Sequence, residues 1–271
     1  FGSHNISLSE PQIMGILNVT PDSFSDGGKH ANVKQALSHA LKMIDEGATF
    51  IDIGGESTRP GAKDVSLQEE LDRTIPIIEA LAANSECVIS IDTSKAEVMR
   101  EAVKAGAGLI NDVKALQAPG AIDAAVKSGV PVCLMHMQGE PGSMQEQPLY
   151  DDVVEEVAQY LESKASELIK RGHSKDKIII DPGIGFGKNL AQNLEIMQNI
   201  QKFKINNCGI LLGSSRKSWI NGIDNSDVSN RLGGSLASAL YCYKKGVKMF
   251  RVHDVKETYQ ALKVYKNLCL M

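Results

Sequence analysis

The chain has 271 residues, a length that fits one large α/β domain as well as two smaller ones. Its 42% hydrophobic and 23% charged content is ordinary for a globular protein, and its formal net charge of −4 argues against nucleic acid as the main partner. No unbroken apolar run approaches the ~18 residues of a membrane span, and no signal peptide is visible, so we expect a cytoplasmic protein.

Five cysteines are spread widely along the chain, and no two of them have the C-x-x-C spacing of a metal site. Cys87, Cys133 and Cys208 lie in or beside apolar runs, and the remaining two are Cys242 and Cys269. This distribution is typical of small buried hydrophobic side chains in a reducing compartment, and it favours that role over disulfides or metal binding.

The first apolar run in chain order is Ile13–Leu17, which reads as a buried strand. The residues before it, 1–12, are expected to form a lead-in, and the opening "FGSH" resembles a cloning remnant. After the run comes "NVTPDSFSDGG", Asn18–Gly28, a polar stretch with a single aromatic residue. A connector of this kind normally needs only a few residues, so this length suggests a loop that moves or binds.

Seven more apolar runs follow, and both faces of each are apolar, as in strands buried within a parallel sheet. Amphipathic segments between them predict helices, among them Val33–Glu46, Ser66–Leu81, Lys95–Ala105 and Asp151–Lys170. Eight such units in ~250 residues, with no linker, predict a single α/β domain, a (β/α)₈ (TIM) barrel over residues 13–271. The eight runs are Ile13–Leu17, Phe50–Ile53, Val88–Ile91, Leu109–Ile110, Val130–Met135, Ile178–Ile180, Gly209–Leu212 and Val247–Val252.

A polar residue stands at the carboxyl end of each of these runs. In a barrel of this kind, the carboxyl ends of the strands line the active site. A single Asp in such a place is equally often the N-cap of the next helix, and for Asp92 that reading stays open. Eight strands that end alike nevertheless point to a site, made by Asn18, Asp52, Asp92, Asn111, His136, Asp181, the turn Gly213–Lys217, Arg251 and His253.

Three of these residues, Asp92, Asn111 and Asp181, come from different strands and face one mouth. A carboxylate can accept hydrogen bonds from a ring N–H and an exocyclic amine together, and Asn offers both a donor and an acceptor. The set therefore suits a flat, nitrogen-rich heterocycle.

The last two strands end in basic residues. Lys217 lies in "GSSRKSW" after the seventh strand, and Arg251 and His253 are two apart on the eighth, so they point to the same side. This region of a barrel commonly binds phosphate, although a salt bridge at the barrel mouth is an alternative role for Arg251. For His136 in "MHMQG", a structural role and a ligand contact stay equally open.

Two loops are rich in glycine. "DPGIGFGK", Asp181–Lys188, lacks the spacing and the terminal Ser or Thr of a P-loop, and its glycines are expected to let Phe186 move beside a ligand. "GGESTRPGA", Gly54–Ala62, offers the Thr58 hydroxyl and the Arg59 guanidinium on a flexible loop.

Taken in order, these strand-end motifs resemble the dihydropteroate synthase family. The resemblance runs from Ile13 to about Val255 through "IMGILNVTPDSFSDGG", "IDIGGESTRPGA", "SIDTSKAEV", "INDV", "LMHMQGEP", "IIDPGIGFGK", "GSSRKS" and "RVHDV". It implies a transferase that condenses 6-hydroxymethyl-7,8-dihydropterin diphosphate with p-aminobenzoate, using Mg²⁺, to give 7,8-dihydropteroate and pyrophosphate. It also implies sensitivity to sulfonamides, which mimic p-aminobenzoate.

The resemblance further implies three sets of site residues. The pterin-binding residues of the family would fall on Asp92, Asn111, Met135, Asp181 and Lys217. Those near the diphosphate would fall on Asn18, which reaches the metal ion, and on Arg59, Lys217, Arg251 and His253. Those of the p-aminobenzoate pocket would fall on Thr58, Pro60, Phe186, Ser215 and Lys217.

The long first loop then has an expected role as a lid. Asn18 would anchor it near the metal ion, and the mobile portion, Thr20, Pro21, Asp22 and Phe24, would close over the p-aminobenzoate pocket. A homodimer is the expected assembly, since barrels of this family often pair.

Other activities are compatible with parts of this pattern. A pterin-dependent methyltransferase domain would not be expected to have the first loop or "SRKS", since it expels no diphosphate. An aldolase that uses Lys217 as a nucleophile would need a desolvated lysine. A catalytically silent pterin-binding paralogue should have lost lid or diphosphate residues, and here Arg251 and His253 are both present.

Overall fold

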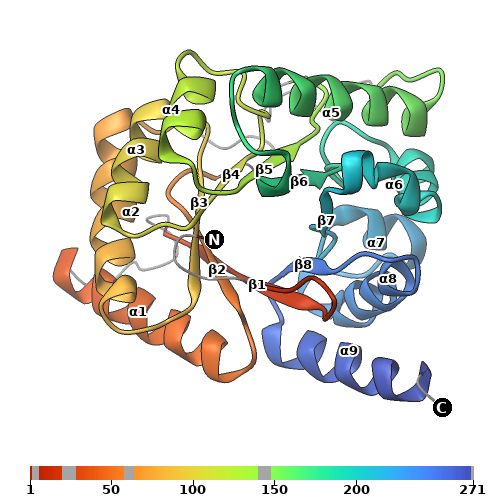
Figure 1. Ribbon diagram of the computed structural model, residues 1–271. Coiled ribbons are helices and arrows are strands. Elements are labelled where there is room, and N and C mark those ends of the chain that lie inside the picture. The colour runs from red at the N-terminus through yellow and green to blue at the C-terminus, as the bar shows by residue number, and fades with distance from the viewer. Residues whose placement is uncertain (2–5, 20–28, 58–63, 140–147, 270–271) are drawn as a thin grey trace.

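The structure is a computed structural model that describes residues 1, 6–19, 29–57, 64–139 and 148–269. Eight parallel strands close into a barrel in chain order, from β1 beside β2 round to β8 beside β1. In Figure 1 the helices follow one another round the outside in the same order, from α1 at the lower left to α9 at the bottom. The predicted (β/α)₈ barrel is confirmed.

The strands are short and lie close to the predicted runs. Most of them extend one or two residues further at the carboxyl end, so that strand-end residues such as Asp92 and Asp181 still belong to the ladder. The fifth begins later than predicted, because Pro131 has no N–H for the ladder. The strands are β1 Gln12–Asn18, β2 Phe50–Gly54, β3 Val88–Asp92, β4 Leu109–Asp112, β5 Val132–Met135, β6 Ile178–Asp181, β7 Gly209–Leu212 and β8 Met249–Val252.

A helix follows each strand, and two helices, α7 and α8, lie between β7 and β8. The four helices predicted by range are confirmed to within two residues at each end, except that α1 begins four residues earlier. The α-helices are α1 Lys29–Asp45, α2 Leu67–Ala82, α3 Ala96–Ala105, α4 Ala121–Ser128, α5 Val153–Lys170, α6 Leu190–Gln198, α7 Ser218–Asp224, α8 Leu232–Lys244 and α9 Val255–Cys269. Short 3₁₀ turns are η2 Lys175–Lys177, η3 Ile200–Phe203, η4 Ile205–Asn207 and η5 Val228–Asn230.

The alternation of the strands divides the hydrophobic core in two. One side of each strand faces the helices and joins them in the larger cluster, as Ile51 and Leu134 do. The other side faces the barrel axis, where each strand gives one side chain to a closed apolar layer of Met14, Phe50, Val88, Leu109, Cys133, Ile179, Leu211 and Met249. Any polar residue an even number of positions further along a strand therefore also faces inward, above this layer.

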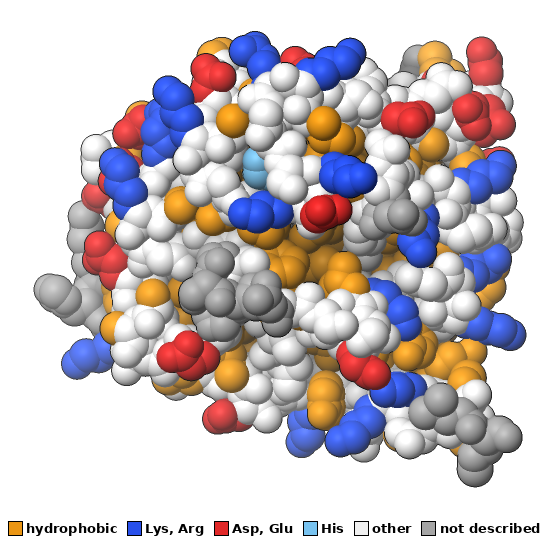
Figure 2. Space-filling view, in the orientation of Figure 1, with side chains coloured by type: hydrophobic (Ala, Val, Ile, Leu, Met, Phe, Trp, Pro, Cys, Tyr) orange, Lys and Arg blue, Asp and Glu red, His pale blue; other side chains and the backbone are white. Residues whose placement is uncertain are grey.

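The other predictions concern the cysteines, membrane-spanning segments and the charge of the surface. All five cysteines are free; Cys133 and Cys208 are buried as predicted, Cys87 is only partly buried, Cys242 is buried and Cys269 is exposed. Within the described part of the chain, no helix is both long and apolar enough to cross a membrane. On the face drawn in Figure 2, Lys and Arg side chains are interspersed with Asp and Glu round a centre that contains hydrophobic side chains.

Candidate active site

The inward-facing polar side chains form one layer at the carboxyl ends of the strands. Asp52 stands two residues after Phe50, and Arg251 stands two residues after Met249, so both point into the barrel above the apolar layer. Asn111 and Asp181 likewise stand two residues after Leu109 and Ile179, and Asp92 stands four residues after Val88, so all three also face inward. The structure thus brings together five of the strand-end residues that the sequence singled out.

Arg251 is the hub of this layer. Its Nε donates to Asp52 Oδ2 at 2.6 Å, and its Nη2 donates to Asp92 Oδ2 at 2.8 Å. Asp52 Oδ2 also accepts from Asn111 Nδ2 at 3.2 Å. Asp52 is fully buried, and its other oxygen, Oδ1, has no hydrogen-bond partner among the described residues. One guanidinium therefore links strands β2, β3 and β8.

The alternative role of Asp92 as a helix cap is wrong. The N-cap residue of α3 is Lys95, and no side chain makes a cap hydrogen bond there. The Thr93 hydroxyl accepts from the Lys95 N–H at 3.1 Å instead. The Asp92 carboxylate, at the carboxyl end of β3, instead forms a salt bridge with Arg251.

Burial and charge act against each other in this layer. Burial raises the pKa of Asp92 to about 7, although Arg251 opposes the shift. Burial also raises the pKa of Asp181, with Lys217 opposing, and lowers the pKa of Lys217 to about 8, with Asp181 opposing. Burial acts to lower the pKa of Arg251, but Asp52 and Asp92 outweigh it, and that pKa is raised. Three carboxylates thus face two cations, which favours a ligand that brings N–H donors.

Lys217 lies across the loop that follows β6. Its Nζ donates to the Ile184 carbonyl and lies 4.4 Å from the centre of the Phe186 ring. A Cβ on Gly213 would lie 3.7 Å from Asp181 Oδ2 and 3.8 Å from Lys217 Nζ, so both side chains pass close to this glycine. The lysine, the aromatic ring and the carboxylate occupy one side of the barrel mouth.

In the turn after β7, the side chains of Arg216 and Lys217 point in different directions. The Arg216 backbone has a φ of +55°. Its guanidinium pairs with Asp254 through both oxygens, away from the buried layer. Ser215 turns the other way, and its Oγ accepts from the His253 N–H at 3.2 Å and lies 3.2 Å from His253 Nδ1. Ser215, Lys217 and His253 are therefore the members of this region that belong to the site.

Asn18 and Met135 complete the described mouth. Asn18 ends β1 opposite Gly54, and a Cβ on that glycine would lie 3.8 Å from Asn18 Oδ1 and 3.6 Å from the Asp92 Cβ. Met135 ends β5 opposite Asp181 and is 4% exposed. An amide oxygen and an apolar side chain thus border the carboxylates.

Several predicted site residues lie outside the described residues. They are Thr20, Pro21, Asp22 and Phe24 of the first loop, and Thr58, Arg59 and Pro60 of the second.

His136 has a structural role. Directly after β5 it falls on the same side as Leu134, which faces the helices, and its ring packs edge-on against Tyr160 of α5 with 5.0 Å between centroids. Its Nδ1 lies 2.9 Å from Nζ of Lys188. Burial, followed by the charge of Lys188, lowers the pKa of His136 to about 3, so the ring is neutral. It does not belong to the barrel mouth.

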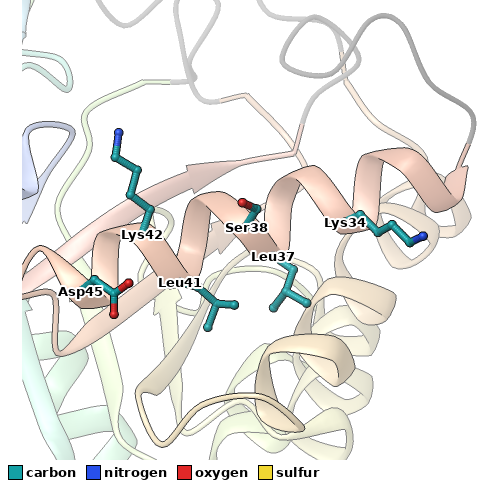
Figure 3. A pocket seen from close by; sticks show the side chains of 6 residues that line it. All are labelled: Lys34, Leu37, Ser38, Leu41, Lys42 and Asp45. Atoms are coloured by element: carbon teal, nitrogen blue, oxygen red, sulfur yellow. The ribbon is translucent and has the colours of Figure 1, made fainter.

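A hollow of about 430 Å³ lies elsewhere, on the outside of α1 (Figure 3). Leu37 and Leu41 point the same way from the helix, and Lys42 points to the opposite side. All six lining residues belong to α1, and none of them is at a strand end: Lys34, Leu37, Ser38, Leu41, Lys42 and Asp45. The hollow has no group suited to the chemistry of the barrel mouth.

Two residues received no individual role from the sequence, although Asp52 was counted among the site residues. Asp52 was one of eight strand-end residues, and its place on the Phe50 side of β2 could have marked it as inward-facing. Lys188 closes a glycine-rich motif, and nothing in its sequence context indicates that only 2% of it is exposed.

Within this fold, the buried carboxylates, the amide and the two cations define a pterin-binding enzyme. The family model described as "Pterin binding enzyme" matches residues 14–253. The chain belongs more narrowly to the dihydropteroate synthase family, whose members are transferases.

Relatives and solved structures agree on this family. The chain is 52% identical to the dihydropteroate synthase of Escherichia coli (strain K12) over 260 residues, covering 96% of this chain and 92% of that protein. It is 49% identical to that of Haemophilus influenzae, with 96% and 95% covered. The structure of Yersinia pestis dihydropteroate synthase with a sulfonamide drug complex has a TM-score of 0.94 at 49% identity, with 99% and 98% covered. That of the Xanthomonas albilineans enzyme in complex with 7,8-dihydropteroate has a TM-score of 0.89 at 43% identity, with 98% and 96% covered.

Proposed function

We propose that this chain condenses 6-hydroxymethyl-7,8-dihydropterin diphosphate with p-aminobenzoate to give 7,8-dihydropteroate and pyrophosphate. The observation that carries this proposal is the single buried layer in which Arg251 joins Asp52 and Asp92 next to Asn111. Membership of the dihydropteroate synthase family supplies the reaction. We assign it to one cytoplasmic catalytic domain over residues 13–271.

The pterin ring would lie against the carboxylates. Asp92 and Asp181 each present oxygen acceptors to a ring N–H and an exocyclic amine, and Asn111 offers a donor and an acceptor for the remaining edge. Met135 would pack on the face of the ring, and Lys217 would complete the pocket. The excess of carboxylates over cations supports this placement, because the recognised edge of a pterin is rich in N–H donors.

The diphosphate would lie beside the cations. Arg251 and His253 are two residues apart on one side of β8 and its extension, and a guanidinium with an imidazole suits a phosphate anion. Because Arg251 is already bonded to Asp92, the pterin and the diphosphate would meet at this pair. Arg59 and Lys217 are further candidates for this anion.

The residues present fit a magnesium ion carried by the substrate. Mg²⁺ usually keeps waters and phosphate oxygens and takes only one or two protein ligands. No group of three His, Cys, Asp or Glu side chains that could hold a metal ion occurs in the described part of the chain. Asn18 ends β1 beside Gly54, and its Oδ1 would supply the protein ligand. The ion, when bound, would neutralise charge on the departing pyrophosphate.

The p-aminobenzoate would approach from the side of Phe186 and Ser215, with Lys217 between them. Cleavage of the C–O bond at the exocyclic methylene leaves a cationic carbon that the dihydropterin ring delocalises, so the step is dissociative. The arylamine is neutral and already nucleophilic at pH 7, and no strong base is needed. What the protein must do is hold both reactants and keep water from the cation. Thr58 and Pro60 are proposed for the same pocket.

Pyrophosphate release tests the proposal. The purified chain is incubated with the pterin diphosphate and Mg²⁺, with and without p-aminobenzoate, and pyrophosphate and dihydropteroate are both measured. We expect release that needs both substrates and matches the dihydropteroate formed. Binding of the pterin without turnover would favour a silent paralogue. Methyl transfer to or from a pterin, with no pyrophosphate formed, would favour the methyltransferase reading.

A homodimer is part of the proposal. Ile223 of α7, Val228 of η5 and Tyr241 of α8 are exposed apolar side chains on consecutive elements, which supports pairing through that side. Light scattering coupled to size exclusion would give the mass in solution, and a monomer at micromolar concentration would contradict it.

A further inference from the structure

Lys188 is a lysine that the catalytic layer does not use, yet it is only 2% exposed. Its Nζ lies 2.9 Å from His136 Nδ1, 2.9 Å from the Phe186 carbonyl oxygen and 3.0 Å from that of Gly183. The His136 carbonyl oxygen lies at 3.5 Å. None of these four acceptors is a carboxylate.

A buried ammonium without a carboxylate partner is costly, by several kcal/mol per ion in real proteins. Burial accordingly lowers the pKa of Lys188 well below that of a lysine in water. An apolar side chain of the same length would fill this space at lower cost, but it would bond to none of the four acceptors. A lysine at position 188 is therefore expected where one side chain has to donate hydrogen bonds to several acceptors.

Those bonds join two loops, the one after β5 and the one after β6. The glycines of the second loop pack directly on the first: a Cβ on Gly183 would lie 1.9 Å from the His136 carbonyl oxygen, and one on Gly187 would lie 2.4 Å from that of Gln138. Both glycines have positive φ, +70° and +61°. These glycines, which were expected to let Phe186 move, allow the backbones of the two loops to approach closely. The hydrogen bonds of Lys188 then hold the two loops together.

The same loop carries the groups that touch Lys217. The Ile184 carbonyl accepts from Lys217 Nζ, and the Phe186 ring lies 4.4 Å from it. Lys188 holds the carbonyl oxygens of Gly183 and Phe186, and those two residues flank the segment that Lys217 contacts. A displacement of this segment would move Phe186 and Lys217 together.

We propose that Lys188 is a positioning residue for the p-aminobenzoate pocket, a role that rests on the proposed function. It acts through the backbone of residues 183–186 on Phe186 and Lys217. His136 is its partner, since a neutral ring with an unprotonated Nδ1 can accept from the ammonium. Asp92 and Asn111, the pterin residues on other strands, lie outside this chain of contacts, whereas Asp181, which accepts from the Gly183 N–H at 2.7 Å, and Lys217 are shared with the pterin pocket.

Lys188→Met tests the proposal, because Met has a similar length but cannot donate a hydrogen bond. Steady-state kinetics give KM for each substrate separately. We expect the KM for p-aminobenzoate to rise about tenfold or more, and the KM for the pterin diphosphate, whose pocket shares Asp181 and Lys217, to rise less, by about threefold. The matched control is Lys177→Met: Nζ of this exposed lysine bonds the Gly129 carbonyl at 2.6 Å at the start of β6, and its loss should change neither KM.

Equal rises in both KM values, or an unchanged KM for p-aminobenzoate, would overturn the proposal. Wild-type turnover in the same assay tests the proposed function separately. If the wild type does not turn over, calorimetric binding of p-aminobenzoate to wild type and variant makes the same comparison. If Lys188→Met does not fold, His136→Phe removes one acceptor and keeps the carbonyls. A smaller rise confined to p-aminobenzoate would then support the role, and no change would overturn it.

Discussion

Arg251 holds two carboxylates at once, and this geometry depends on the shape of a guanidinium. Nε and Nη2 reach Asp52 and Asp92 on different strands, which the single ammonium of a lysine cannot do with the same geometry. The residue that would meet the diphosphate is thus also the one that orients a pterin-binding carboxylate.

Arg251→Lys should separate charge from shape. The charge remains but one of the two bonds is lost, so we expect affinity for the pterin diphosphate to fall by about 10- to 100-fold and affinity for the free pterin to fall less. Isothermal titration with both ligands measures the difference. Arg100→Lys, at an arginine of α3 whose side chain is exposed and pairs with Glu97, is the control and should leave both affinities unchanged. Equal losses for the two ligands would mean that Arg251 acts only on the protein itself.

Asp92 and Lys217 predict how activity depends on pH. Burial raises the pKa of Asp92 to about 7, so below that pH the carboxyl gains a proton and ceases to accept from both donors of the pterin. Burial lowers the pKa of Lys217 to about 8, so above that pH its charge is lost. We therefore expect kcat/KM for the pterin diphosphate to rise through about pH 7 and to fall through about pH 8.

Lys217→Arg checks the second half of this profile. An arginine stays charged throughout this range, so the alkaline fall should move to higher pH while the acid rise stays in place. An alkaline fall that stays at about pH 8 in the variant would assign it to another group.

At the scale of elements, the sequence predicted the strands and helices whose apolar residues form a clear pattern. Apolar runs of two to six residues gave eight strands, and the stripe of apolar residues in Asp151–Lys170 gave α5. Helices α4 and α7 were not predicted by range because they have only eight and seven residues, and α8 was not because its apolar residues do not form a sharp stripe. That His136 faces the helices was also not predicted. Side chains two residues apart along a strand lie on the same side, so the position of Leu134 could have indicated it.

The start of α5 offers a test of an element by itself. Asp152 is its N-cap, and Oδ1 accepts from the N–H groups of Val154 at 3.0 Å and Glu155 at 2.9 Å. Asp152→Ala should lower the free energy of unfolding by about 1 kcal/mol and leave both KM values unchanged. Urea denaturation measures the first and the turnover assay the second. Asp151→Ala, one residue earlier and without a cap bond from its side chain, should have less effect; equal losses would refute the cap.

At the scale of the whole molecule, barrel closure creates the site. Arg251 bonds Asp52 across 199 positions of sequence and Asp92 across 159. In a (β/α)₈ barrel the carboxyl ends of all strands lie at one mouth, so the predicted fold class was enough to predict which residues lie close together. It could not predict which of them bond, because an Arg at a strand end can turn to several neighbours. The burial of Lys188 was equally out of reach, because it depends on how two loops pack.

The stability of the whole molecule should report the proposed magnesium ion. A ligand that binds only the folded chain stabilises it by about 2.7 kcal/mol at a free concentration of 100 times Kd. We expect the pterin diphosphate to raise Tm more with Mg²⁺ than with EDTA, and the free pterin to raise it equally in both. Asn18→Ala should abolish the difference that Mg²⁺ makes while preserving the shift caused by the free pterin, because only the metal-bound diphosphate reaches Asn18. Asn84→Ala, at an exposed residue two positions after the end of α2, is the surface control. A magnesium-dependent shift that persists in Asn18→Ala would place the ion on other ligands.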